Sequence, residues 1–154
     1  MFNKIKDYVK DSSRVLDLYC GVGTLGLNVA KKVKHVYGVE IVPNAIEDAK
    51  KNALLNGVDN TSYYCGKVEN VLSKLPKSID VVIVDPPRDG LDTKTKKQLL
   101  DIKSDTIIYI SCDPMTLARD ITYLKEEYEI IEIEGMDMFP YTYHVETLCV
   151  LKHK

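Results

Sequence analysis

Hydrophobic residues along this chain occur in two patterns that alternate as far as residue 128. Short continuous apolar runs are typical of buried parallel strands, and apolar residues three or four positions apart are typical of helices that pack on a sheet. The predicted strands span residues 14–19, 36–40, 63–65, 79–84, 106–111, 129–133 and 145–151. The predicted helices span residues 2–10, 24–32, 43–55, 68–75, 93–102 and 114–128.

This order of elements predicts an α/β fold with a doubly wound, mostly parallel seven-stranded sheet. Strands that alternate with helices form crossover connections and therefore run parallel. The last two strands are joined by a loop over residues 135–144 without a helix, so an antiparallel edge strand should close the sheet. Because the chain has 154 residues and neither a repeat nor a linker, we expect a single domain over residues 1–154.

A glycine-rich turn joins the first strand to the helix that begins near Thr24. Gly21 and Gly23 allow positive φ angles and let a ligand approach the backbone closely. The free N–H groups at the start of the helix point toward whatever lies over this turn. The turn is therefore predicted to bind a nucleotide cofactor.

Two cofactors are compatible with this turn. Residues 21–26 match the dinucleotide fingerprint, and Glu40 follows at the spacing of the ribose-binding acid, which is typical of an NAD-dependent oxidoreductase. S-adenosylmethionine also fits: Asp17 could accept a hydrogen bond from its ammonium group, Glu40 could accept from both ribose hydroxyls, and Ile41 could pack on adenine. An antiparallel closing strand is not part of the usual dinucleotide-binding sheet, which favours S-adenosylmethionine.

Two further strand ends carry reactive side chains. Cys112 follows the fifth strand directly before a helix that Asp113 can cap, a position where a thiol can act as a nucleophile. Asp85 follows the fourth strand, where Pro86 and Pro87 stiffen the turn and Arg88 could bind a phosphate or carboxylate. Ligands of open α/β sheets bind beyond such strand ends. The alternatives are a buried structural cysteine and a rigid turn without a catalytic role.

Five blocks of sequence together resemble the catalytic domain of the S-adenosylmethionine-dependent RNA (uracil-5-)-methyltransferases. The blocks are residues 17–26, Gly38-Val39-Glu40, Asp85-Pro86-Pro87-Arg88-Asp89-Gly90, Ser111-Cys112-Asp113-Pro114 with Leu117-Ala118-Arg119-Asp120, and Asp137-Met138-Phe139-Pro140 with His144-Val145-Glu146. The resemblance covers nearly the whole chain. The glycine-rich block alone is unspecific, whereas the last three blocks in combination are specific to this family.

The resemblance implies that Tyr19, Glu40 and Asp85 contact the cofactor, that Cys112 is the nucleophile, and that Glu146 is the general base. These residue types suit the chemistry, because C5 of uracil is a weak nucleophile until a thiolate adds to C6. A base must then remove the C5 proton so that the thiolate can leave. Without the resemblance, an acid within an apolar strand is more typical of the solvent-exposed face of an edge strand.

The loop before the last strand carries the predicted contacts to the base. Phe139 and neighbouring tyrosines offer aromatic surfaces on which a flipped-out base could stack, and His144 is interpreted as a structural or substrate contact. With Arg88, these residues form the predicted substrate site.

The charge of the chain limits its own affinity for RNA. A formal net charge of −2 provides no general basic surface, which RNA binding normally requires. Members of the resembling family usually carry an N-terminal RNA-binding barrel, and a cofactor-contacting glutamine that they carry before the first strand is missing here. We therefore expect a C-terminal catalytic fragment whose missing part supplies most of the affinity for RNA. A cofactor-binding remnant without catalytic activity is the alternative.

The remaining features are those of an ordinary cytoplasmic enzyme. Four cysteines (Cys20, Cys65, Cys112 and Cys149) are scattered without CxxC spacing, which predicts neither a metal site nor a disulfide framework. No apolar run is long enough to span a membrane. We expect a cytoplasmic monomer.

Overall fold

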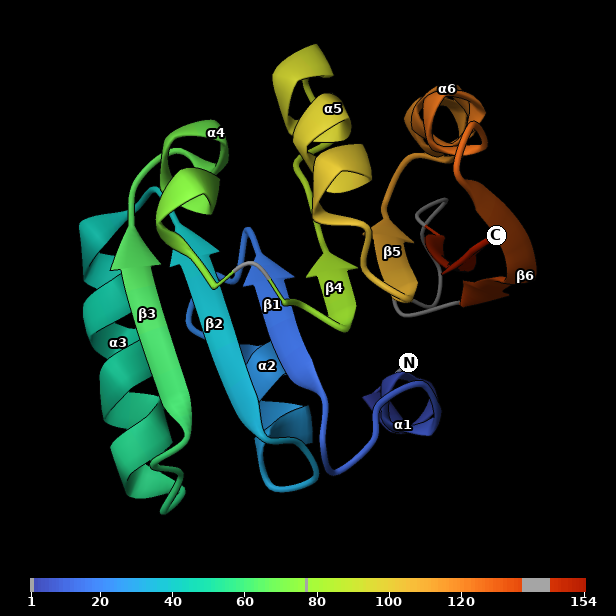
Figure 1. Cartoon of the computed structure of the whole chain (residues 1–154). Helices are drawn as coiled ribbons and strands as arrows, with labels where there is room; N and C mark the ends of the chain where they lie inside the picture. Colours follow the sequence, from blue (N-terminus) through green and yellow to red (C-terminus); the bar gives the residue numbers. More distant parts are fainter. Residues whose placement is uncertain (1, 77, 137–144) are drawn as a thin grey trace.

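The computed structural model describes residues 2–76, 78–136 and 145–154, and these form a seven-stranded sheet (Figure 1). The strands are β1 (Arg14–Leu18), β2 (His35–Glu40), β3 (Thr61–Cys65), β4 (Val81–Val84), β5 (Thr106–Ser111), β6 (Tyr128–Met136) and β7 (Glu146–His153). Their order across the sheet is β3-β2-β1-β4-β5-β7-β6. The first five strands are parallel, so the predicted doubly wound α/β fold is confirmed.

The reversed strand lies one position inside the edge that the sequence predicted for it. β7 runs antiparallel to β5 on one side and to β6 on the other, so β6 forms the edge of the sheet. Insertion beside β5 suits β7 because its central residues are apolar and fully covered, whereas much of β6 is exposed. A strand that is apolar on both faces is stable in the interior of a sheet and not at its edge.

Helices cover both faces of the sheet, and the sheet separates two hydrophobic cores. The helices are α1 (Phe2–Asp7), α2 (Thr24–Ala30), α3 (Pro43–Leu55), α4 (Val68–Val71), α5 (Thr93–Ile102) and α6 (Pro114–Leu124). One core contains residues of α1, α2 and α3, and the other contains residues of α4, α5 and α6. Figure 1 shows α2 and α3 on one face and α4 and α5 on the other.

Several element boundaries differ from the sequence prediction. α1 ends at Asp7 instead of residue 10, and α6 ends at Leu124 instead of residue 128. Tyr128 belongs to β6, where it pairs with His153 of β7, and its buried hydroxyl donates to the Ser104 carbonyl at 3.0 Å. β6 continues to Met136, which pairs with Glu146, so this strand includes two residues that were predicted as loop.

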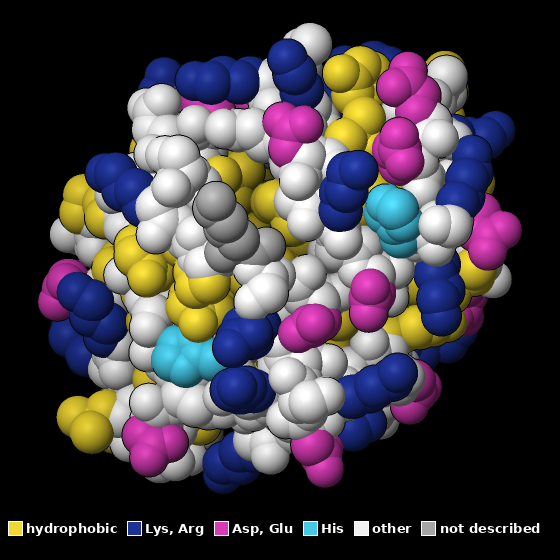
Figure 2. Space-filling model, in the orientation of Figure 1, with side chains coloured by type: hydrophobic (Ala, Val, Ile, Leu, Met, Phe, Trp, Pro, Cys, Tyr) yellow, Lys and Arg dark blue, Asp and Glu magenta, His cyan; other side chains and the backbone are white. Residues whose placement is uncertain are grey.

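The face of the molecule drawn in Figure 2 has no continuous basic patch. On the face shown in Figure 2, the lysine and arginine side chains are mixed with aspartate and glutamate side chains. This mixture agrees with the small negative net charge. Among the residues that the structure describes, no helix has the length and apolar character needed to span a membrane.

Candidate active site

The carboxyl edge of the sheet brings the predicted site residues together. Parallel strands all end at this edge, as their arrowheads show in Figure 1, so the loops after β1, β2, β4 and β5 meet there. β7 begins at the same edge because it runs in the opposite direction. Ser111 at the end of β5 pairs with Thr147 near the start of β7, so Cys112 directly follows β5 and Glu146 begins the neighbouring strand β7. The reversed strand is therefore what delivers Glu146 to the edge that carries Cys112.

The glycine-rich turn after β1 has the backbone conformation that its sequence predicts. Gly21 has φ of 51° and Gly23 has φ of 83°, and Tyr19 also has a positive φ, of 61°. A Cβ on Gly23 would lie 2.9 Å from the hydroxyl of Tyr63, whereas one on Gly21 would meet no atom within 4 Å. Gly21 therefore faces open space that a ligand can enter, and Gly23 packs against the protein beneath.

Sequence reasoning missed Tyr63, the side chain that supports this turn. Tyr63 pairs with Gly38 across β2 and β3, and a Cβ on Gly38 would lie 2.6 Å from its ring. The same Cβ would lie 3.0 Å from the thiol sulfur of Cys20. A glycine within β2 opposite an aromatic residue of β3 is the signal that could have identified this contact.

Glu40 fixes the turn and still has capacity for a ligand. One carboxylate oxygen accepts from the N–H of Gly21 at 3.1 Å, and the other accepts from the N–H of Val42 at 2.9 Å. An ionised carboxylate has about four lone-pair positions, so each oxygen can accept a further hydrogen bond. Glu40 is only partly buried, and its side chain can therefore reach a ribose above the turn.

A cavity of about 280 Å³ lies next to Glu40. Its lining includes Tyr19, Ile41, Val68 and Pro87. The side chain of Ile41 is 55% exposed, so an apolar surface is available there to pack on a flat base. A carboxylate acceptor beside apolar walls fits the ribose and adenine of S-adenosylmethionine.

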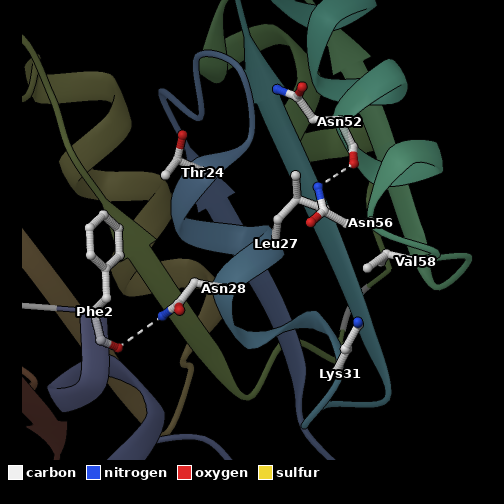
Figure 3. Close-up of a pocket in the computed structure, with 8 residues that line it drawn as sticks. All are labelled: Phe2, Thr24, Leu27, Asn28, Lys31, Asn52, Asn56 and Val58. Carbon is white, nitrogen blue, oxygen red and sulfur yellow. Dashed lines mark hydrogen bonds between the residues drawn. The ribbon is translucent and has the colours of Figure 1, made fainter.

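A larger cavity, of about 460 Å³, lies away from the predicted site residues (Figure 3). It is lined by Phe2, Thr24, Leu27, Asn28, Lys31, Asn52, Asn56 and Val58. None of these is a predicted site residue. All three asparagine amides already donate to backbone carbonyls, Asn28 to Phe2 and Asn56 to Asn52 at 2.8 Å and Asn52 to Val22 at 3.1 Å. The smaller cavity is therefore the better candidate for the cofactor.

Asp17 lies beneath the glycine-rich turn and is 1% exposed. Its Oδ2 accepts from the N–H of Gly26 at 2.8 Å, and its Oδ1 has no hydrogen-bond partner among the described residues. Burial raises the pKa of Asp17 to about 7, the Gly26 hydrogen bond opposes this shift, and the charges of Asp85 and Glu40 add to it. The structure thus gives Asp17 a role in holding α2 to β1, and its predicted contact with the ammonium group stays a prediction.

We expect the substitution Asp17→Asn to change how stability depends on pH. Because the folded-state pKa is raised to about 7 from 3.8, the stabilising contribution of Asp17 is fully present below about pH 4 and is lost as pH rises to about 7. The free energy of unfolding of the Asn variant, relative to the wild type, should therefore increase between about pH 4.5 and about pH 8. Urea denaturation at both pH values measures this difference.

The control for this measurement is Asp48→Asn on the exposed face of α3, where Asp48 pairs with Lys51 at 3.1 Å. A surface ion pair contributes little to stability, so its difference from the wild type should stay nearly constant between the two pH values. If the free energy of unfolding of Asp17→Asn relative to the wild type were also the same at both pH values, the raised pKa of Asp17 would be contradicted.

The charge of Glu146 acts on the carboxyl group of Asp85. Asp85 is exposed as a residue, yet burial of its carboxyl group and then the negative charge of Glu146 raise its pKa to about 6. Perturbed carboxyl groups of this kind are common at functional sites. Arg88 in the same loop is exposed and takes part in an interaction within the protein.

Cys112 occupies a tight turn between β5 and α6. The Ser111 hydroxyl accepts from the N–H of Asp113 at 3.0 Å and donates to its carbonyl at 2.8 Å, and the Asp113 carboxylate caps α6 by accepting from the N–H of Met115 at 2.8 Å. Cys112 itself is partly buried. These contacts fix the backbone on both sides of the thiol.

The other three thiols are poor candidates for a nucleophile in this site. Burial raises the pKa of Cys149 to about 11 and raises the pKa of Cys20 still further. Cys65 is exposed at the end of β3, at the opposite side of the sheet from β7. Phe139 and His144, the predicted contacts to the base, lie outside the described residues. Among the described residues, no group of His, Cys, Asp and Glu could hold a metal ion.

This sheet order, with a glycine-rich turn after β1 and an acid at the end of β2, defines a Rossmann-like methyltransferase domain. Residues 72–154 match the tRNA (uracil-5-)-methyltransferase family, and residues 3–102 match the methyltransferase small domain. The chain belongs to the tRNA (uracil-5-)-methyltransferase family. S-adenosylmethionine is the cofactor of this family, which decides against the dinucleotide alternative.

Individual relatives agree with this assignment. An uncharacterized RNA methyltransferase of Staphylococcus aureus is 46% identical over 159 residues, which cover 100% of this chain and 35% of that protein. The crystal structure of the Pyrococcus abyssi tRNA (uracil-54, C5)-methyltransferase in complex with S-adenosyl-L-homocysteine is similar, with a TM-score of 0.86, 39% identity, and coverage of 97% of this chain and 36% of that chain. An rRNA methylase of Streptococcus thermophilus is 16% identical with a TM-score of 0.80 and supports the fold alone. The chain spans about a third of the length of its curated relatives.

Proposed function

We propose that this chain transfers a methyl group from S-adenosylmethionine to C5 of a uridine in tRNA or rRNA. The observation that supports the proposal most is the pairing of Ser111 with Thr147, because Cys112 directly follows Ser111 and Glu146 directly precedes Thr147 at the carboxyl edge of the sheet. The influence of Glu146 on the pKa of Asp85 supports the same arrangement, since it requires the two carboxyl groups to be near each other.

Cys112 and Glu146 divide the reaction between them in this proposal. The Cys112 sulfur forms a bond to C6 of uracil, and the electron pair of the C5–C6 double bond moves toward C5 and the O4 carbonyl. When bound, S-adenosylmethionine would supply an electrophilic methyl group, which C5 would take up as the methyl–sulfonium bond breaks and S-adenosylhomocysteine leaves. The Glu146 carboxylate then accepts the C5 proton, the double bond forms again, and the Cys112 thiolate leaves.

The other predicted residues hold the two substrates. We assign Glu40 to the ribose hydroxyls of the cofactor and Ile41 to its adenine. Gly21, Gly23, Tyr19 and Asp85 form the rest of the cofactor site, with Asp17 beneath them. Arg88, Phe139 and His144 are proposed as contacts to the RNA. Parts of a longer protein, outside this chain, would supply most of the affinity for RNA.

Incubation of the chain with labelled S-adenosylmethionine and tRNA or rRNA transcripts tests the proposal. Digestion to nucleosides should yield labelled 5-methyluridine. A methyl group on another atom of uridine, or on another base, would contradict the proposal. Binding of S-adenosylhomocysteine without any transfer would instead support a cofactor-binding remnant.

We expect Glu40→Ala to weaken binding of S-adenosylhomocysteine by roughly tenfold to 100-fold, because it removes charged acceptors of ribose hydrogen bonds and a support of the Gly21 turn. Isothermal titration calorimetry measures this change. The control is Glu47→Ala on α3, whose exposed carboxylate pairs with Lys50 at 2.9 Å and lies outside the cavity. Equal affinities for the two variants would show that Glu40 does not hold the cofactor.

A further inference from the structure

A buried ionic cluster centred on Asp120 lies beside the loop that follows β4. Asp120 is fully buried. Its Oδ2 accepts from the N–H of Leu91 at 2.7 Å and from the hydroxyl of Tyr109 at 2.8 Å. Its Oδ1 accepts from Lys96 at 3.1 Å and from two nitrogens of Arg119, each at 3.0 Å. A single carboxylate thus connects the loop after β4 to β5, α5 and α6.

The loop after β4 is held by this cluster at two points. Besides the Leu91 N–H bond, Arg119 donates to the carbonyl of Asp89 at 2.6 Å. Between them, Gly90 has φ of 72°, and a Cβ there would lie 2.4 Å from Oδ2 of Asp120. The backbone therefore approaches the carboxylate so closely that only glycine fits, and the loop has no room to shift toward α6.

This same loop forms one wall of the cofactor cavity. Pro87, Gly90 and Asp92 line the cavity together with Glu40 and Ile41, and the loop begins at Asp85. Asp120 itself belongs to α6, which starts two residues after Cys112. The cluster is thus the physical link between the wall of the cofactor cavity and the helix that follows the proposed nucleophile.

We propose that Asp120 is a positioning residue that sets the distance between the loop 85–92 and the glycine-rich turn, and thereby the affinity for the cofactor. The inference rests on the proposed function of the site. Asp120 does not line the cavity itself, and so it acts through Leu91, Gly90 and Asp89.

The charge of Asp120 is essential to this role. Burial alone would oppose ionisation, but the hydrogen bonds from the Leu91 N–H, Tyr109, Lys96 and Arg119 hold the pKa of Asp120 below its ordinary value. An asparagine would keep one acceptor oxygen and replace the other with an N–H₂ donor. Lys96 and Arg119 are cationic donors, so the remaining oxygen would face them and the N–H₂ group would face the Leu91 N–H, which would lose its acceptor.

Two measurements on Asp120→Asn test the role, and neither requires RNA or Cys112. Amide hydrogen exchange at Leu91 should become faster by roughly 100-fold, because its N–H loses a buried acceptor. The affinity for S-adenosylhomocysteine should fall by about tenfold or more, because the wall of the cavity is released. If the wild-type chain transfers no methyl group to uridine while these two results hold, the proposed function is contradicted and the positioning role stays in place.

The matched control is Tyr128→Phe. It removes a buried hydrogen bond to Ser104, which lies just before the amino end of β5, away from the carboxyl edge that carries the site. It should lower the stability of the same half of the molecule and leave both the Leu91 exchange and the cofactor affinity within about twofold of the wild type. If Tyr128→Phe weakened cofactor binding as much as Asp120→Asn, the effect would be general destabilisation and the positioning role would be overturned.

A second variant keeps the test decisive if Asp120→Asn does not fold. The side chain of Arg119 is 53% exposed, so Arg119→Ala leaves the core intact while it removes the bonds to Asp89 and Asp120. It should weaken binding of S-adenosylhomocysteine by roughly threefold to tenfold. Wild-type affinity in this variant, together with unchanged exchange at Leu91, would overturn the proposal.

Discussion

Replacement of Cys112 by alanine should abolish the covalent complex between this chain and RNA that contains 5-fluorouridine. Fluorine at C5 cannot be removed as a proton, so a wild-type enzyme that has added its thiolate to C6 and methylated C5 remains attached to the RNA. Without the thiol, no bond to C6 can form, and methyl transfer should fall by at least roughly 10³-fold. Denaturing gel electrophoresis of labelled RNA measures the complex directly.

The affinity of Cys112→Ala for S-adenosylhomocysteine should stay within about twofold of the wild type, because Cys112 does not line the cofactor cavity. Cys65→Ala is the matched control, since it removes an exposed thiol at the end of β3. This variant should still form the complex. A complex that persists in Cys112→Ala, or one that disappears in Cys65→Ala, would place the nucleophile elsewhere.

The sequence predicted the strands and helices of the parallel half of the sheet closely, because local patterns determine them. Continuous apolar runs such as Val81–Val84 can only be buried between two layers, and Pro43 marks the start of α3 within one residue. The position of β7 depended on long-range pairing that no local pattern contains. The alternation of polar and apolar residues in β6, with Glu132 and Glu134 next to exposed isoleucines, was the available signal for an edge strand.

The sequence predicted those site residues that lie at the ends of strands. Glu40 ends a parallel strand, and Asp85 and Cys112 each directly follow one, so the topology alone predicts that all three lie at the same edge of the sheet. The supporting contacts were not predictable, because Tyr63 beneath the turn and the cluster at Asp120 depend on side chains from elements far apart in the sequence. Asp17 illustrates the same limit: its position before the turn suggested a ligand, whereas its orientation beneath the turn becomes apparent only in the structure.

The second large effect is expected for Glu146→Gln, which should trap the chain on ordinary uridine RNA. Glutamine has nearly the same shape as glutamate and lacks a basic carboxylate. Addition of Cys112 and methylation of C5 should therefore continue, while removal of the C5 proton slows by roughly 10²-fold to 10⁴-fold. The covalent intermediate should accumulate on denaturing gels without fluorine in the RNA. Single-turnover kinetics should show a fast methylation phase followed by slow release.

Glu129→Gln provides the control. Glu129 is an exposed glutamate of the edge strand β6, opposite Lys152 in the strand register and at the other end of β7 from Glu146. It should release product at the wild-type rate. Release at the wild-type rate in Glu146→Gln as well would show that another group removes the proton.

Glu146→Gln has a second consequence that does not depend on turnover. The negative charge of Glu146 is one of two causes that raise the pKa of Asp85 to about 6, and burial is the larger one. Removal of that charge should lower the pKa of Asp85 part of the way toward its ordinary value of 3.8, because burial remains. NMR measures the pKa of Asp85 in the wild type and in Glu146→Gln through the chemical shift of its carboxyl carbon as a function of pH. An unchanged pKa would mean that the two carboxyl groups do not face one site, which would remove the main electrostatic support for Glu146 as the base.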